Sequence, residues 1–222
     1  MVHTSHLVSC DAYTRSLEKA THVDFRDKIL KLFVNFVKLK NLRNPRKSDL
    51  EIVADLSKAR KWLKFLKLSR GVNSIFSAKI PVLTRIENIS DLVQMIADDL
   101  DTLQNSGILG LFGFKLDGVG DFADQAWFIW SAIACFNSFS RLRLELGKRG
   151  ERDEEKMRME IILFLKLFCE LGDSVIALTP KGMKKSQGWV VASASLGSIS
   201  ALCSLYKFFY PYFSISFLDD DT

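Results

Sequence analysis

The chain has 222 residues and a mass of 25.2 kDa, with 48% hydrophobic residues and 17 Phe against 4 Pro and 12 Gly. These values exclude a disordered or collagen-like chain and allow a substantial buried core. The net charge of +5 is unevenly spread, because residues 26–85 hold 16 basic and 4 acidic side chains, a block that indicates an anionic partner, either nucleic acid or a membrane.

The first predicted element is an amphipathic helix over residues 24–42. Its apolar residues Phe25, Ile29 and Phe33 recur at helical spacing, and lysines and arginines occupy the other positions. Asn44-Pro45 interrupts this pattern, because the residue before a proline avoids the helical conformation. A second helix then opens near Ser48 and continues to about Arg70.

The second helix, over residues 49–70, is the candidate membrane-binding segment. A helix packed on a core would explain its amphipathic pattern equally well, but a polar face of lysine and arginine beside bulky aromatic residues favours a membrane interface. At 100° per residue, Leu56, Ala59, Trp62, Leu63 and Leu66 share one face, with Arg60, Lys61, Lys64 and Lys67 opposite and Phe65 near the basic side.

A third helix is predicted over residues 84–103, and it is acidic. Asp91, Asp98 and Asp99 accompany an apolar face that includes Ile89 and Ile96. The opposite charge suggests that this helix packs against one of the basic helices. The Gly- and Phe-rich stretch of residues 106–121 is predicted to be a loop.

Two apolar runs near the C-terminus are candidate membrane spans, over residues 123–139 and 190–210. The second is long enough to cross a bilayer and carries small residues at four-residue spacing, Ser193, Gly197 and Ala201, which permit close helix packing and indicate self-association. Between the runs, residues 141–160 are predicted to form one solvated helix. Residues 161–178 are predicted to be an amphipathic or protein-packed helix, because Lys166, Glu170 and Asp173 are costly in lipid.

The sequence contains no recognisable catalytic constellation, so we expect a protein that is not an enzyme and binds no metal or cofactor. Gly118-Val119-Gly120 followed by Ala123 is similar to a dinucleotide-binding motif, but no strand-like segment precedes it. The four cysteines are far apart, which predicts reduced, buried thiols. The first residues lack the apolar run of a secretory signal, in keeping with a reducing compartment.

Three stretches of the chain resemble the peroxin-eleven family of peroxisomal membrane proteins. They are Arg26-Asp27-Lys28-Ile29, the segment from Leu56 to Leu68, and the C-terminal third from Glu160 through Cys169-Glu170-Leu171-Gly172-Asp173 and Leu178-Thr179-Pro180-Lys181 to Tyr210. They occur in the family's order over nearly the whole chain. Each is mostly apolar and basic, so their order and spacing carry the resemblance.

The resemblance implies a multi-pass protein of the peroxisomal membrane, or of the glycosomal membrane in a kinetoplastid, that elongates and divides the organelle. It implies that the amphipathic segment inserts into an anionic phospholipid membrane. It also implies homo-oligomers and recruitment of dynamin-type fission machinery with its adaptors. A membrane pore or metabolite channel is the alternative function, and a soluble nucleic-acid binder is the least favoured.

Together these features predict an all-α integral membrane protein with N-terminal amphipathic helices and a C-terminal pair of membrane-associated or spanning helices. The predicted regions are an N-terminal, membrane-binding part over residues 1–105, a loop over residues 106–122, and a membrane-embedded part over residues 123–222.

Overall fold

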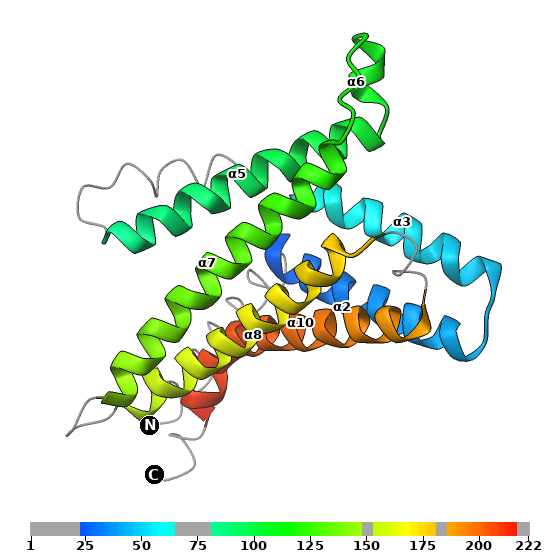
Figure 1. Ribbon diagram of the computed structural model, residues 1–222. Coiled ribbons are helices and arrows are strands. Elements are labelled where there is room, and N and C mark those ends of the chain that lie inside the picture. The colour runs from blue at the N-terminus through cyan, green and yellow to red at the C-terminus, as the bar shows by residue number, and fades with distance from the viewer. Residues whose placement is uncertain (1–22, 65–80, 148–152, 181–185, 217–222) are drawn as a thin grey trace, which may run out of the picture.

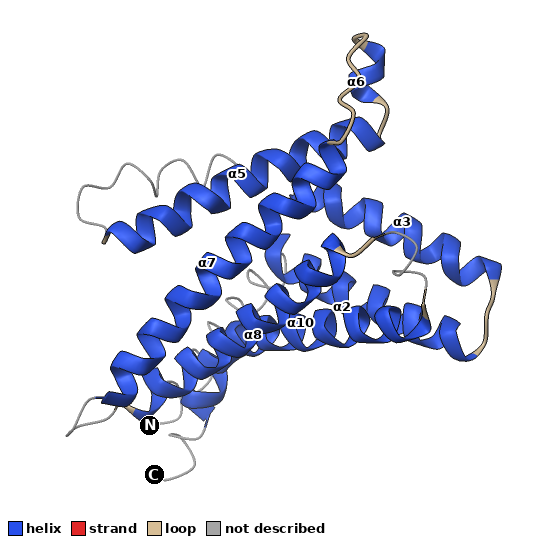
Figure 2. Cartoon of the chain, viewed as in Figure 1, coloured by secondary structure: helices blue, strands red, loops and turns tan. Residues whose placement is uncertain are grey.

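The computed structural model describes residues 23–64, 81–147, 153–180 and 186–216, with side chains as far as Tyr210. All regular structure in these ranges is helical, and no strand occurs in them (Figure 2). The helices are α2 (Val23–Arg43), α3 (Lys47–Lys64), α5 (Val82–Asn105), α6 (Ile108–Leu111), α7 (Val119–Gly147), α8 (Glu154–Leu178) and α10 (Gln187–Ser216). The all-helical prediction is therefore confirmed for the described residues.

The six long helices are arranged so that each packs mainly on one or two others (Figure 1). Each helix packs on the next in the series α3, α2, α10, α8, α7 and α5. A sparse contact between α5 and α3 joins the two ends of this series. The neighbours α2 and α10 come from opposite ends of the sequence. The short helix α6 lies inside the predicted loop and projects away from the other helices (Figure 1).

The prediction of one solvated helix over residues 141–160 is wrong. Residues up to Gly147 continue α7, and a separate helix, α8, begins at Glu154. The side chain of Asp153 marks this start, because its Oδ1 accepts a hydrogen bond of 3.0 Å from the backbone N–H of Lys156. The charged residues described in this stretch therefore belong to the C-terminal end of α7 and the N-terminal end of α8.

The interior of the bundle is unusually polar. The apolar side chains that are completely buried are small, such as Ala97, Ala134 and Ala201, whereas charged Asp27 and Glu170 are buried beside them. Several contacts between helices are made by hydroxyl groups. The Oγ atoms of Ser131 on α7 and Ser174 on α8, for example, are 2.9 Å apart. Small residues and hydroxyl pairs of this kind are typical of helix packing in membranes.

The outward faces of the helices carry the large apolar side chains. On α8 every exposed residue from position 161 to 178 is apolar, whereas α2 and α5 expose large apolar residues along their middle and charged or polar residues such as Arg26, Lys40 and Arg85 nearer their ends. The exposed large apolar residues of these helices include Ile29, Phe33 and Phe36 on α2, Ile86, Ile89, Val93 and Ile96 on α5, and Ile161, Leu165, Phe168, Val175 and Leu178 on α8. The bundle thus buries several charged and hydroxyl side chains and exposes many large apolar ones.

In the described part of the chain, one helix is long and apolar enough to cross a membrane by length and composition, the segment Gln187–Tyr210 of α10. This matches the second predicted span. The first predicted span, over residues 123–139, lies within α7, which does not meet the same criterion.

Candidate functional site

The inward-facing charges line a cavity of about 470 Å³ between the helices. Its walls come from α2, α3, α5, α7 and α8, which bring together segments from both ends of the sequence. The volume lies within the range of roughly 300 to 1,000 Å³ that is usual for small-molecule sites. This cavity is the candidate functional site.

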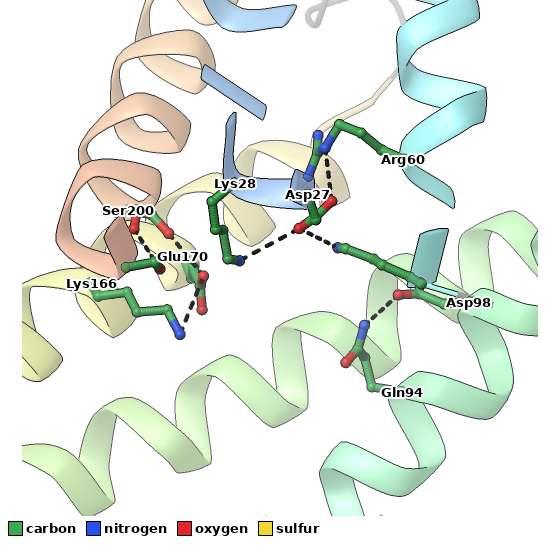
Figure 3. A network of polar contacts seen from close by, with 10 residues as sticks. Asp27, Lys28, Arg60, Gln94, Asp98, Lys166, Glu170 and Ser200 are labelled. Atoms are coloured by element: carbon green, nitrogen blue, oxygen red, sulfur yellow. Dashed lines mark hydrogen bonds and ion pairs between the residues drawn. The ribbon is translucent and has the colours of Figure 1, made fainter. Parts of the chain in front are cut away.

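Asp27 on α2 is the centre of the largest cluster of charges in this cavity, and its side chain is only 1% exposed. Its Oδ1 accepts a hydrogen bond of 3.0 Å from Nε of Arg60 on α3. Lys28 and Lys64 contribute further ion pairs, with Nζ atoms 3.7 Å and 4.0 Å from Oδ2 (Figure 3). Three basic side chains therefore share one carboxylate, and burial lowers the pKa of one of them, Lys28, to about 7.

A second buried carboxylate, Glu170 on α8, lies close to the first cluster. Its Oε1 accepts a hydrogen bond of 2.8 Å from Ser200 on α10 and lies 3.9 Å from Nζ of Lys166 (Figure 3). Its Oε2 is buried and has no hydrogen-bond partner. One turn further along α8, Asp173 accepts a hydrogen bond of 2.6 Å from Ser193.

Lys31 on α2 also lines the cavity and is 9% exposed. Within the described part of the chain its Nζ forms no close ion pair, although it interacts at longer range with Glu170 and Asp173. Burial lowers the pKa of Lys31, so an anion bound in the cavity would favour its charged form.

The wall formed by α5 is acidic. Asp91, Asp98 and Asp99 face the cavity, and Gln94 donates a hydrogen bond of 2.5 Å to Oδ2 of Asp98 (Figure 3). Burial raises the pKa of Asp98 to about 6, against the lowering effect of Lys64 and Lys61 and with a further rise from Asp101 and Asp99. Trp127 and Trp130 of α7 line the adjoining wall. The cavity therefore has a basic side and an acidic side.

The basic face of α3 points toward the interior of the bundle. Arg60 contacts Asp27, Lys64 lies near the same carboxylate, and Lys61 pairs with Asp101 of α5. The expected pairing of the acidic helix with a basic helix is confirmed by the contact of Lys61 with Asp101. On the other side, Trp62 is 44% exposed, while Leu56 and Leu63 are partly buried.

Three of the predicted membrane-binding residues, Phe65, Leu66 and Lys67, lie outside the described residues. The others are brought together on the last two turns of α3, but the structure engages their cations in ion pairs within the chain. The interaction of this helix with lipid headgroups stays a prediction.

The small residues predicted for self-association lie at contacts inside the chain. A Cβ atom on Gly197 would be 2.7 Å from Nδ2 of Asn35 on α2, and Ala201 is completely buried. Ser193 donates its hydrogen bond to Asp173 on α8. The predicted close approach of helices therefore occurs between α10 and its neighbours in the same chain, and association between copies stays a prediction.

The sequence contained an indication of the Asp27 cluster that the count of basic and acidic residues over residues 26–85 did not reveal. Asp27 is the only acidic residue between positions 26 and 48, in the middle of the basic block. A lone carboxylate among so many cations is expected to gather several of them when it is buried.

The described residues contain no group of three or more His, Cys, Asp or Glu arranged to hold a metal ion. Cys135, Cys169 and Cys203 are free and buried, as predicted, and Cys10 lies outside the described residues. In comparisons with known proteins, no family model, no curated protein and no solved structure matches this sequence.

Proposed function

We propose that this chain is an integral membrane protein of the peroxisome, or of the glycosome in a kinetoplastid, that remodels and elongates the organelle membrane during proliferation and fission. The observation that supports membrane integration most strongly is the distribution of side chains, with charges inside and large apolar residues outside. In a bilayer this arrangement keeps the charges away from hydrocarbon. The peroxisomal location comes from the resemblance in sequence.

In this proposal α10 and α7 cross the membrane as a pair, with α8 packed between them. Lys166 and Glu170 of α8 then face the cavity, while the apolar row from Ile161 to Leu178 contacts lipid. This placement answers the objection that the charges of α8 are too costly for a membrane helix.

The remodelling element in this proposal is α3 with the residues that follow it. Its exposed side chains include Leu50, Ile52 and Trp62, which suit the boundary between headgroups and acyl chains. Its cations are bound to Asp27 and Asp101 in the structure described here. When α3 inserts, anionic lipid phosphates would have to replace these carboxylates as its partners. Each basic residue near such a surface contributes about 1 kcal/mol of electrostatic attraction to the membrane.

The test is to image peroxisomes in cells that overexpress the tagged full-length protein with a matrix marker. We expect elongated or more numerous organelles with the unchanged protein, and normal targeting without elongation for Leu63→Asp combined with Leu66→Asp. The control is Ala54→Asp, at an exposed position of the same helix away from the predicted apolar face. Normal elongation by the first double variant would contradict insertion of this helix.

A second candidate function is a membrane pore or metabolite channel, favoured by the charged cavity itself. Asp173 lies in its wall, on a helix that is otherwise apolar along its outer face. Reconstituted liposomes should then pass small solutes, and Asp173→Leu should abolish the flux while the exposed control Asp117→Leu preserves it. Sealed liposomes with the unchanged protein inserted would argue against a pore.

A further inference from the structure

The two sides of the cavity differ in the sign of their charge, and this difference selects a class of ligand. On the basic side, Lys28, Arg60 and Lys64 surround the carboxylate of Asp27, and Lys31 interacts at longer range with Glu170 and Asp173. Burial lowers the pKa values of Lys28 and Lys31, so a bound anion would favour their charged forms. A phosphodiester would accept hydrogen bonds from several of these basic side chains.

The opposite side suits a cation. Asp91, Asp98 and Asp99 lie along one face of α5, and the two indole rings of Trp127 and Trp130 adjoin them. Carboxylates together with the faces of tryptophan rings are a favourable environment for an ammonium group, including a quaternary one. A ligand that joins an anion to a cation would therefore satisfy both sides at once.

The contact between α3 and α5 is sparse. Lys61 and Asp101 form an ion pair across it. Lys61 is about half exposed, so this pair is near the surface. Exposed ion pairs contribute little to stability, and this one can open without great cost.

We propose that the cavity binds a zwitterion in which a phosphodiester is joined to an ammonium group, the chemistry of phosphocholine and phosphoethanolamine headgroups, and that lipid headgroups enter through the contact between α3 and α5. The entry of lipid rests on the proposed membrane location. In this arrangement the phosphate contacts Lys31 and Lys64, the ammonium group contacts Asp98 and Trp130, and the acyl chains remain outside the bundle.

Binding is measured by titration calorimetry on the full-length protein purified in a maltoside detergent. The probes are dihexanoylphosphatidylcholine below its micellar concentration, soluble glycerophosphocholine, dihexanoylphosphatidylglycerol, and choline chloride. We expect the phosphatidylcholine to bind at least about tenfold more tightly than the phosphatidylglycerol or choline, because each of these satisfies one side only.

The variants address the two sides separately. Lys31→Gln should weaken phosphatidylcholine binding about tenfold, and Asp98→Asn should do the same from the other side. Lys64→Gln is a second variant of the basic side, for use if Lys31→Gln fails to fold. The side chain of Lys64 is partly exposed, so this position should tolerate substitution. The matched controls are Lys58→Gln and Asp55→Asn, which are exposed on α3 and do not line the cavity. They should bind like the unchanged protein.

Each outcome has a definite meaning. Equal binding of phosphatidylcholine, phosphatidylglycerol and choline, or variants that bind like the controls, would overturn the zwitterion site. Equal binding of glycerophosphocholine and phosphatidylcholine would leave the zwitterion site but overturn lateral entry from lipid. Resistance of the protein to alkaline carbonate extraction from membranes is measured in parallel. Loss of phosphatidylcholine binding in a carbonate-resistant protein overturns this inference alone, whereas extraction by carbonate overturns the membrane location and lateral entry together.

Discussion

The contact between α7 and α8 and the contact between α3 and α5 are built in opposite ways. Between α7 and α8, buried Ala134, Cys135 and Leu167 pack with larger side chains such as Phe164. Between α3 and α5, the ion pair of Lys61 with Asp101 bridges two helices that otherwise touch little. One side of the cavity is therefore held by apolar packing, and the other is joined, among the described residues, by few contacts that include an ion pair.

Asp27→Asn is expected to have the largest effect, because it removes the carboxylate that attaches α3 to α2. Leaving Arg60, Lys28 and Lys64 without their shared partner should lower the free energy of unfolding by about 4 kcal/mol. Thermal unfolding in detergent measures this loss. Binding to anionic vesicles should rise at the same time, since the cations of α3 are released. Reduced vesicle binding would show that the ion pairs do not compete with lipid.

Leu167→Ala tests the packed side and should cost about 3 kcal/mol, because it opens a cavity at a site that is 4% exposed. The control is Leu165→Ala, on the same helix but facing outward, which should change unfolding by much less in detergent. If both variants lose equal stability, α7 and α8 are not held together by packing in the way described.

The pH dependence of stability should reveal the acidic wall of α5. The pKa of Asp98 is raised by burial to about 6, with Asp99 and Asp101 beside it on α5, Lys61 and Lys64 facing it from α3, and uncharged Trp127 and Trp130 on α7. The folded state therefore binds the proton more tightly than the unfolded state does. The stabilisation is fully present below about pH 4 and is lost as the pH rises through about 6.

The corresponding gain on lowering the pH from 7 to 5 is about 1 kcal/mol for this group. Other groups titrate over the same range, so the relevant measurement is the difference between the unchanged protein and Asp98→Asn in denaturant unfolding at the two pH values. Asp117→Asn, at an exposed position, is the control. The same slope in all three proteins would show that Asp98 titrates normally.

Lys61→Ala should have the smallest effect on stability, roughly 0.5 kcal/mol, because the ion pair it removes is partly exposed. The contact between α3 and α5 should nevertheless open more often. Amide hydrogen exchange should become faster in Lys47–Lys64 and stay unchanged in α8. Unchanged exchange in α3 would mean that this contact is held by more than the ion pair.

Much of the fold was predictable because helix positions depend on local patterns. Apolar spacing and the Asn44-Pro45 break placed α2 and the start of α3 to within a few residues, and the small residues of α10 indicated the close approach seen at Gly197. The division between α7 and α8 was missed, because the charges of residues 141–160 continue across it without a change in pattern.

The orientation of α3 could not be read from its sequence. A helical wheel shows that Arg60 and Trp62 lie on different faces, but it does not say which face points inward. That choice depends on Asp27 and Asp101, which are distant in sequence and lie on two other helices. In the same way, the prediction identified Lys166, Glu170 and Asp173 as unusual charges, while their common cavity required the tertiary structure.

Because α2 packs on α10, this contact can form only late in synthesis on the ribosome. About 140 residues separate the end of α2 at Arg43 from the start of α10 at Gln187. At ordinary elongation rates of about 5 to 20 residues per second, roughly 7 to 30 seconds pass before α2 can meet this neighbour. During that interval Phe25 lacks its ring contacts with Phe208 and Phe209, and Asn35 lacks the close approach of Gly197. The packing of α2 on α10 therefore forms only after nearly the whole chain has been synthesised.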